Sequence, residues 1–180
     1  GQFPATLGDG SRWGLSIRYS MEGRDHGGAL ETAGGIAKAL PWLTQGGAGA
    51  FWVVSGDIYA PDFRFDAELA ARFAANPGLD AHLWLVPNPP FHPAGDFGLG
   101  ADGLGLAGAG PDGKRWTYGN LALIKPSLVR DIAPGTRAAL GPLLYQGMNE
   151  RRIAADIYTG RWENIGTPAQ LEALNRGLAA

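Results

Sequence analysis

The sequence predicts one α/β domain across residues 1–180, with a β-hairpin insertion in its second half. Two short apolar runs, at residues 51–54 and 81–86, have the composition of strands buried inside a sheet. Segments of helical composition lie before, between and after them, whereas Gly and Pro divide residues 95–124 into short pieces. With 180 residues and 45% hydrophobic side chains, the chain is large enough to bury a full core.

The first third of the chain is predicted to contain two helices and a strand. Residues 3–7 have the pattern of a helix end, because Gly8 follows them as a typical C-terminal glycine. Residues 16–20 alternate apolar and polar side chains, which predicts a strand. Residues 34–40 have helical composition, and we expect that helix to end at Pro41, which lacks a backbone donor.

The middle of the chain predicts two buried strands with a helix between them. Residues 51–54 form a continuous β-branched and aromatic run, typical of a parallel strand that is buried on both faces. Residues 66–76 predict a helix with Asp66 as its N-cap, ended by the Pro-Gly pair that follows. Residues 81–86 predict the second buried strand.

The second half begins with the insertion and returns to α/β order. Asp-Gly pairs within residues 95–124 predict antiparallel hairpins, and we expect residues 116–124 to complete that hairpin sheet. Residues 137–149 have helical composition, and residues 153–158 predict a short strand. The last helix is expected to begin just after Thr167, a capping residue followed by a proline suited to the first helical position.

Composition and charge exclude several classes of protein. The net charge of −2 lacks the basic character of a nucleic-acid binder, and no stretch approaches the ~18 apolar residues of a membrane span. There is no Cys, which excludes disulfides and thiolate zinc sites and suits a reducing cytoplasm. The three His, at positions 26, 82 and 92, lack the spacing of a metal-binding pair. His82 is typical of a core residue, and we assign no role to His92.

A cluster of glycines imitates a dinucleotide-binding motif. Gly98, Gly100 and Gly103 match the G-x-G-x-x-G spacing. A dinucleotide site needs a buried strand before this motif and a helix after it, so that phosphate meets the helix N-terminus. Here turns interrupt the run and a strand follows it, so we interpret the cluster as the rim of a hairpin.

Two polar positions follow the first buried strand directly. Gly56 and Asp57 lie at its carboxyl end, where ligands bind in open α/β sheets. Gly56 would let a substrate approach the backbone, and the Asp57 carboxylate is a hard ligand suited to Mg²⁺. An equally open alternative is that Asp57 is a turn residue that caps the next segment.

Two further segments carry polar groups at the ends of elements. In residues 30–36, Thr32 could cap a helix whose exposed N–H groups contact a base, sugar or phosphate. An ordinary glycine-rich helix entry is the alternative. In residues 161–168, either Glu163 or Asn164 could offer an oxygen to a metal, and the strand register decides between them.

Candidate sugar-binding groups lie in a loop and in the expected hairpin sheet. Asn88, Gly95 and Asp96 lie in the loop after the second buried strand, again on its carboxyl side. Tyr118 and Asn120 belong to the hairpin sheet, and their polar groups suit sugar hydroxyls.

Taken in order, these motifs resemble the bacterial sugar-phosphate nucleotidyltransferases, and among them the small uridylyltransferases that act on N-acetylmuramate 1-phosphate. The matching stretches are residues 7–11, 14–20, 30–36, 53–57, 88–89, 95–97 and 162–168. The resemblance implies a Rossmann-like α/β sandwich with a mixed central sheet. It also implies that a sugar-1-phosphate oxygen attacks the α-phosphate of a nucleoside triphosphate such as UTP, with Mg²⁺ bound and pyrophosphate released.

The resemblance further implies roles for single residues. Asp57 matches the catalytic, metal-binding aspartate after the central strand. Asn164 stands where many members have a second metal-binding Asp, and an amide oxygen is the weaker Mg²⁺ ligand. The residues expected at the nucleotide are Glu31, Thr32, Ala33, Gly34 and Gly56. With the two hairpin-sheet residues added, those expected at the sugar are Asn88, Gly95, Asp96, Tyr118 and Asn120.

The sequence departs from this family at its start. The family signature of a strand, a Gly- and Arg-rich phosphate loop and a Pro-Lys-Pro motif is not in it, so we expect an N-terminally truncated chain. Because no such loop grips the triphosphate, we expect the chain to be inactive alone. A non-catalytic domain that retains a sugar-nucleotide pocket is one alternative. A glycosyltransferase is another, although Asp57 and the two residues after it do not form its usual Asp-x-Asp.

Overall fold

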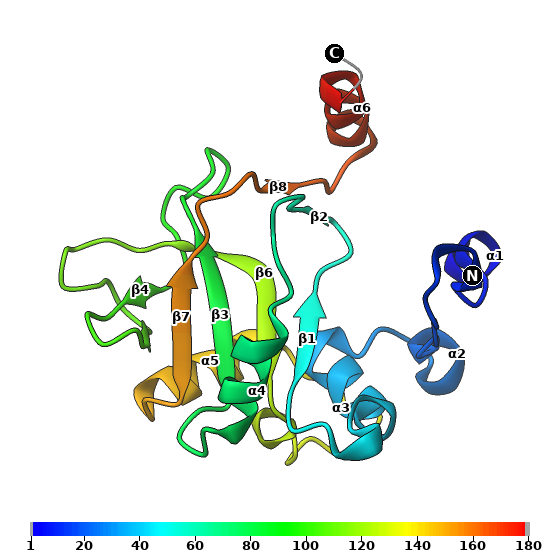
Figure 1. Cartoon of the computed structure of the whole chain (residues 1–180), viewed down its shortest axis with the longest axis horizontal. Helices are drawn as coiled ribbons and strands as arrows, with labels where there is room; N and C mark the ends of the chain where they lie inside the picture. Colours follow the sequence, from blue (N-terminus) through cyan, green and yellow to red (C-terminus); the bar gives the residue numbers. More distant parts are fainter. Residues whose placement is uncertain (1, 179–180) are drawn as a thin grey trace.

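A four-stranded mixed sheet forms the centre of the molecule in a computed structural model that describes residues 2–178 (Figure 1). Its strands, in spatial order, are β1 (Phe51–Val54), β6 (Thr117–Ile124), β3 (Ala81–Val86) and β7 (Ile153–Ile157). β3 and β7 are parallel, and β6 runs antiparallel to both β1 and β3. The carboxyl ends of β1, β3 and β7 therefore lie at one end of the sheet, together with the amino end of β6.

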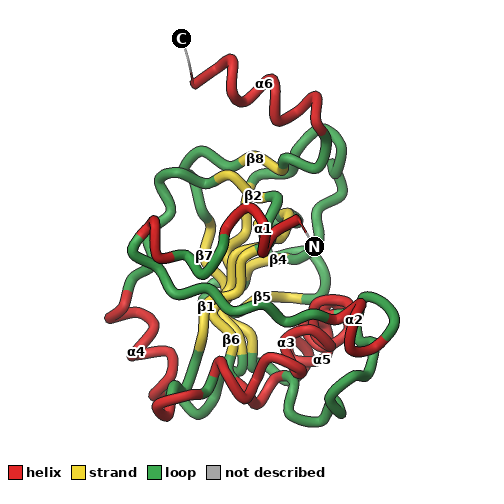
Figure 2. The backbone as a smooth tube through the Cα atoms, turned by 90° about the vertical axis from the view of Figure 1, so that its right-hand side faces the viewer, coloured by secondary structure: helices red, strands yellow, loops and turns green. Residues whose placement is uncertain are grey.

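Helices cover both faces of this sheet (Figure 2). One face packs against α3 (Glu31–Leu43) and α5 (Leu140–Asn149), and the other packs against α4 (Ala67–Ala75). Successive residues of β3 point to opposite faces, so Leu83 belongs to the first core and Trp84 to the second. The expected α/β sandwich with a mixed central sheet is confirmed, and its helices and sheet form three layers.

The remaining elements lie around this sandwich. A two-stranded ribbon of β2 (Ile58–Tyr59) and β8 (Glu163–Asn164) lies beyond the carboxyl ends of β1 and β7 (Figure 1). The peripheral helices are α1 (Gln2–Leu7), α2 (Glu22–His26) and α6 (Pro168–Leu178), with 3-10 turns at Ser11–Trp13, Gln45–Gly47 and Pro126–Leu128. Within residues 2–178, no helix is long and apolar enough to cross a membrane.

Several predicted helix boundaries are confirmed by their capping contacts. The Asp66 carboxylate accepts hydrogen bonds from the backbone N–H groups of Glu68 and Leu69, at 2.8 and 3.0 Å, and so caps α4. The Thr167 hydroxyl accepts the Gln170 N–H at 3.3 Å, at the start of α6. These side chains satisfy donors that a helix leaves free in its first turn.

The prediction for residues 16–20 is wrong, because this segment belongs to no strand in the structure. The polar side chains of its alternating pattern instead form hydrogen bonds to other segments. The Tyr19 hydroxyl donates to the Gly8 carbonyl at 2.5 Å, and the Arg18 guanidinium donates to the Gln45 side chain at 3.1 Å. A strand needs a neighbouring strand to bond its backbone, whereas here the segment is held by these side chains and by a backbone bond from the Ile17 N–H to the Asp9 carbonyl at 2.8 Å.

The boundaries predicted for the first long helix are also wrong. α3 begins at Glu31 with Leu30 as N-cap, so Thr32 lies inside the helix and does not cap it. Pro41 lies within α3 and does not end it. Proline removes one backbone donor near the end of the helix, but the Leu40 carbonyl still accepts the Thr44 N–H at 3.0 Å.

The strand at residues 51–54 exists as predicted, but its pairing and burial are different. β1 pairs antiparallel with β6 and is an outer strand of the sheet, so its prediction as a parallel strand buried on both faces is wrong. Val54 is 43% exposed. An apolar run cannot by itself distinguish an outer strand from a central one.

The glycine cluster forms a hairpin, as predicted. β4 (Gly98–Leu99) and β5 (Gly105–Leu106) pair antiparallel, and the loop between them contacts the outer edge of β7. There the Gly103 carbonyl accepts the Ala155 N–H at 2.9 Å. The expectation that residues 116–124 complete the hairpin sheet is wrong, because β6 lies inside the central sheet between β1 and β3.

A buried ion pair holds the opposite end of the sheet together. Asp80 precedes β3 and is 8% exposed, and its carboxylate accepts hydrogen bonds from the Ser127 hydroxyl and from two nitrogens of Arg152, Nη2 at 2.8 Å. Burial alone would raise the pKa of Asp80, but the hydrogen bonds outweigh it and the pKa is lowered. The Asp80 carbonyl also accepts the Lys125 N–H at 2.9 Å, which joins the end of β6 to the start of β3.

Candidate active site

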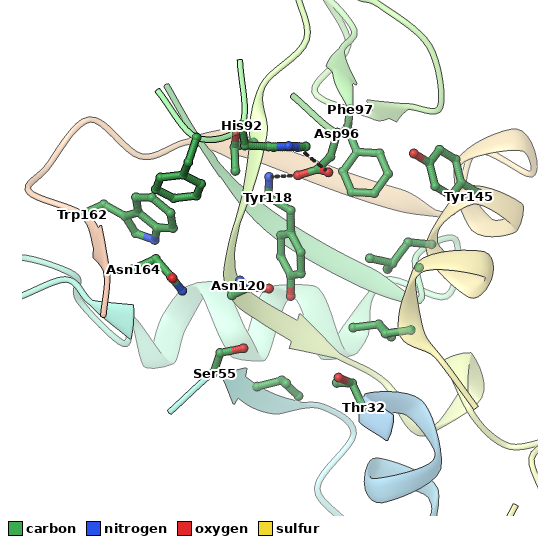
Figure 3. Close-up of a pocket in the computed structure, with 16 residues that line it drawn as sticks. Thr32, Ser55, His92, Asp96, Phe97, Tyr118, Asn120, Tyr145, Trp162 and Asn164 are labelled. Carbon is green, nitrogen blue, oxygen red and sulfur yellow. Dashed lines mark hydrogen bonds and ion pairs between the residues drawn. The ribbon is translucent and has the colours of Figure 1, made fainter. Parts of the chain in front are cut away.

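A cavity of about 480 Å³ opens at the carboxyl ends of β1 and β3 (Figure 3). Ser55 follows β1, the loop of residues 87–97 follows β3, and residues 158–164 follow β7. The antiparallel β6 brings its first residues to the same place. The cavity is lined by Thr32, Val53, Ser55, Phe91, His92, Asp96, Phe97, Thr117, Tyr118, Asn120, Leu140, Gly141, Leu144, Tyr145, Trp162 and Asn164.

Thr117, Tyr118 and Asn120 are the polar residues that β6 contributes to the cavity. Burial raises the pKa of Tyr118 above its ordinary value of 10.0, and its protonated hydroxyl can donate and accept hydrogen bonds. Asn120 has a φ of 55°, a left-handed conformation that asparagine adopts more readily than most residues. Its carbonyl accepts the Ser55 N–H at 3.2 Å, which fixes the turn after β1.

The Asp96 carboxylate joins two parts of the site (Figure 3). One oxygen accepts the Tyr118 backbone N–H at 2.8 Å, and the other lies 3.0 Å from His92 Nε2. The Arg115 guanidinium donates to the Asp96 carbonyl. The carboxylate is therefore held in place by β6 while it orients an imidazole from the loop.

Asn88 and Gly95 shape this loop and do not line the cavity. The Asn88 amide donates to the carbonyls of Pro93 and Arg115, at 3.1 and 3.0 Å, and its oxygen accepts the Thr117 hydroxyl at 2.9 Å. Gly95 has a φ of +62°, and a Cβ there would lie 2.9 Å from the backbone of Arg115. Of the three loop residues expected at the sugar, only Asp96 faces the cavity.

Asp57 and Asn164 are brought together by the β2–β8 ribbon. Asn164 Nδ2 donates to Asp57 Oδ2 at 3.0 Å, and the Ile165 N–H donates to the Asp57 carbonyl at 2.7 Å. Glu163 instead accepts hydrogen bonds from Arg161, with Nε at 2.7 Å. The register therefore places Asn164, and not Glu163, beside Asp57.

Asp57 lies in an adjoining hollow with Gly56 and the start of α6, while Asn164 faces the main cavity. The described residues hold no group of three or more His, Cys, Asp or Glu side chains placed to bind a metal. Beside each other, Asp57 and Asn164 can thus offer a metal one carboxylate and one amide oxygen. Such a pair matches Mg²⁺, which keeps several waters or phosphate oxygens and needs few protein ligands.

The four residues expected at the nucleotide in α3 have different environments. Thr32 lines the cavity, whereas Ala33 is fully buried in the core. Glu31 forms an ion pair with Arg137 at 2.6 Å. The Gly34 N–H donates to the Ala138 carbonyl at 3.1 Å, and a Cβ on Gly34 would lie 2.3 Å from the Thr136 carbonyl. Gly34 is therefore needed for close packing of α3 against the segment before α5.

Several residues that line the cavity were not predicted from the sequence. Ser55 lies between the end of β1 and Gly56, so the same strand-end argument could have found it. His92 was assigned no role. Phe91 and Trp162 separate the cavity from an apolar hollow of about 470 Å³, and the Trp162 indole donates to the Gly119 carbonyl at 2.9 Å. Tyr145 comes from α5, whose amphipathic pattern carries no signal of a site.

The charge of the cavity is unusual for a site that would hold phosphates. Its lining contains no Lys or Arg, and Asp96 is its one carboxylate. His92 is the one lining side chain that can become cationic. Hydroxyl, amide and aromatic groups make up most of the remaining polar surface, which suits the hydroxyls and ring faces of a sugar.

No protein-family model matches the chain. It is 38% identical over 174 residues to the N-acetylmuramate alpha-1-phosphate uridylyltransferase of Neisseria meningitidis serogroup B, an alignment that spans 95% of this chain and 71% of that protein.

Solved structures show the same fold at low sequence identity. A Bacillus anthracis protein, named as a glucose-1-phosphate thymidylyltransferase and solved with a sucrose, superposes with a TM-score of 0.69 at 15% identity, over 97% of this chain and 70% of that chain. HddC from Yersinia pseudotuberculosis superposes with a TM-score of 0.59 at 16% identity, over 84% of this chain and 64% of that chain.

Proposed function

The chain belongs to the sugar-1-phosphate nucleotidyltransferase family, and on this basis we propose that it serves uridylyl transfer from UTP to a sugar-1-phosphate. The observation that carries the proposal is the contact between Asp57 and Asn164 beside a sugar-sized cavity at the carboxyl ends of the strands. The 38% identical relative is named for UTP chemistry on N-acetylmuramate 1-phosphate, which makes that sugar phosphate the first acceptor to test.

The proposed reaction is a single displacement at phosphorus. An oxygen of the sugar-1-phosphate forms a bond to the α-phosphorus of UTP, and the bond from that phosphorus to the β-phosphate oxygen breaks. Pyrophosphate leaves with the electron pair, and the product is a UDP-sugar. Because no covalent enzyme intermediate is needed, the protein acts by positioning the two phosphates in line and by balancing their charge.

Mg²⁺ is the proposed cofactor, held by the Asp57 carboxylate and the Asn164 amide oxygen. When bound, the ion neutralises charge on the transferring phosphate. Asn164 now donates its amide nitrogen to Asp57, so its side chain would turn by half a rotation to present its oxygen. Asp57 remains the stronger ligand of the two, because it carries the charge.

We propose that the remaining candidate residues divide between the two substrates. Tyr118 and Asn120 face the cavity and are proposed to hydrogen-bond sugar hydroxyls. Asp96 is proposed to shape the sugar pocket, because its two oxygens already meet His92 and the Tyr118 N–H, and Asn88 and Gly95 shape the loop that presents it. Thr32 and Gly56 are proposed to lie beside the nucleotide. Glu31, Ala33 and Gly34 would then act by fixing the start of α3.

Binding and turnover are measured separately to test the proposal. We expect calorimetry to detect UDP-N-acetylmuramate bound to the chain with micromolar affinity in Mg²⁺. Asp57→Asn should remove the Mg²⁺-dependent part of that affinity, and Glu163→Gln is the matched control because Glu163 pairs with Arg161 instead. Failure to bind any UDP-sugar or sugar-1-phosphate would contradict the proposed function.

A non-catalytic sugar-nucleotide-binding role is the second candidate, favoured by the lack of Lys and Arg in the cavity lining. For the same reason we expect residues 1–180 alone to release no pyrophosphate from UTP and sugar-1-phosphates. Measurable turnover would refute that expectation and would remove the binding-only candidate. We also propose a cytoplasmic location, in keeping with the lack of Cys, which cell fractionation tests.

A further inference from the structure

His92 occupies a position that the reaction scheme above leaves without a role. It lies in the loop after β3, lines the cavity, and has a side chain that is 39% exposed (Figure 3). No other side chain that lines the cavity can carry a positive charge. A ligand bearing phosphate in this cavity therefore has one candidate cationic partner.

The contacts of His92 fix how its ring is oriented. Nε2 lies 3.0 Å from the Asp96 carboxylate, which can only accept, so Nε2 carries the proton and donates it to Asp96. Asp96 is itself held by the Tyr118 backbone N–H. Nδ1 has no hydrogen-bond partner within residues 2–178. The ring is thus oriented from behind by a carboxylate and keeps its second nitrogen for another group.

The chemistry of that second nitrogen depends on what meets it. A neutral imidazole offers Nδ1 as an acceptor, and a protonated one offers it as a charged donor. Hydrogen bonds between such a protonated ring and an anionic oxygen are among the stronger ones in proteins.

We propose that His92 binds an anionic oxygen of the acceptor sugar phosphate, with Asp96 as the residue that positions its ring. The inference rests on the proposed function, because it takes a sugar-1-phosphate as the occupant of the cavity. Two anionic groups can supply that oxygen. One is the 1-phosphate itself, and the other is a carboxylate on the sugar, which N-acetylmuramate carries on its lactyl ether.

Three ligands distinguish these sources when their binding is measured by calorimetry. N-acetylmuramate 1-phosphate carries both anions, N-acetylglucosamine 1-phosphate carries only the phosphate, and N-acetylmuramate carries only the carboxylate. If the phosphate meets His92, His92→Gln weakens both 1-phosphates by about 10-fold and leaves N-acetylmuramate unchanged. If the carboxylate meets His92, the two N-acetylmuramate ligands weaken and N-acetylglucosamine 1-phosphate is unaffected.

The chain offers a matched control in a second His–Asp pair. His82 Nε2 lies 2.8 Å from the Asp156 carboxylate, but His82 stacks on Trp84 on the other face of the sheet. His82→Gln should therefore leave the affinity for all three ligands unchanged. Asp96→Asn should weaken anion binding in the wild-type background but add no further loss to His92→Gln, because its effect acts through the ring.

Different results would overturn the inference and the proposed function. Equal affinities of wild type and His92→Gln for all three ligands would overturn the inference and leave the function standing. An additional loss from Asp96→Asn in the His92→Gln background would overturn the positioning role. If the wild-type chain binds none of the three ligands, the inference fails, and if it binds no UDP-sugar either, the proposed function fails as well. Circular dichroism of each variant confirms that it is folded before it is compared.

Discussion

Replacing Asp80 with Asn removes one charge from the buried pair that joins β3, β6 and β7. Asp80 accepts two hydrogen bonds from the Arg152 guanidinium, and a bond to a charged group contributes roughly 1.5–3 kcal/mol. Breaking a buried pair typically costs about 3–5 kcal/mol. Because 32% of the Arg152 side chain is exposed, water can solvate part of it, and we expect the low end, about 3 kcal/mol.

Urea denaturation followed by circular dichroism measures this loss. Thermal denaturation of the same variants is a second measure, in which Asp80→Asn should lower the melting temperature by about 6–12 °C. Glu172→Gln is the control, because Glu172 lies 4.0 Å from Arg176 with both side chains more than 70% exposed. That exposed pair should contribute less than about 0.5 kcal/mol.

The pH dependence of the Asp80 contribution follows from the direction of its shift. Its pKa is lower in the folded chain than the ordinary value of 3.8, so the contribution is present above that value and is lost as pH falls through the folded pKa. The difference in the free energy of unfolding between wild type and Asp80→Asn should therefore have its largest value at neutral pH and should shrink only below about pH 4. A loss no larger than that of Glu172→Gln would refute the reasoning.

Three further predictions concern the site and its support. Asn120 has a φ of 55°, so Asn120→Ala should cost about 1 kcal/mol in urea denaturation and Asn120→Gly much less; equal losses would show that the backbone conformation is not the cause. Asn164→Asp should lower stability by about 1 kcal/mol in EDTA, because two carboxylates would then face each other where the Asn164 amide now lies 3.0 Å from Asp57, and should raise Mg²⁺ affinity in calorimetry; unchanged Mg²⁺ affinity would argue against a metal at this pair. Gly34→Ala should cost more than about 2 kcal/mol, because its Cβ would lie 2.3 Å from the Thr136 carbonyl; a stable variant with a normal melting curve would contradict that packing argument.

Local sequence patterns predicted most of the helices and strands, because the start and end of a helix or strand depend on residues close by in the sequence. Asp66 and Thr167 cap their helices through hydrogen bonds to residues two or three positions away. Strand order depends on contacts between distant segments, which is why the insertion of β6 between β1 and β3 was not predicted. The alternation in residues 16–20 was misleading for the same reason, since a strand forms only where a partner is available.

In the candidate site, too, residue chemistry could be predicted from the sequence, whereas contacts between side chains could not. Asp57 and Asn164 were both chosen for their chemistry at strand ends, and the fold brings their side chains within 3.0 Å. The sequence could not show that Asn88 turns its amide into its own loop, because that depends on the carbonyls of Pro93 and Arg115. Nor could it show that His92 meets Asp96 across the cavity rim, since a proline-rich loop has no periodicity from which to infer an orientation.

The hairpin of β4 and β5 has a consequence for engineering the chain. Its loop occupies the outer edge of β7, where the Gly103 carbonyl takes up the Ala155 N–H. An uncovered strand edge readily recruits a strand from another molecule and starts aggregation. The glycine-rich run therefore protects solubility, and an engineer who shortened it to obtain a more rigid protein for crystallisation would instead create an aggregation site.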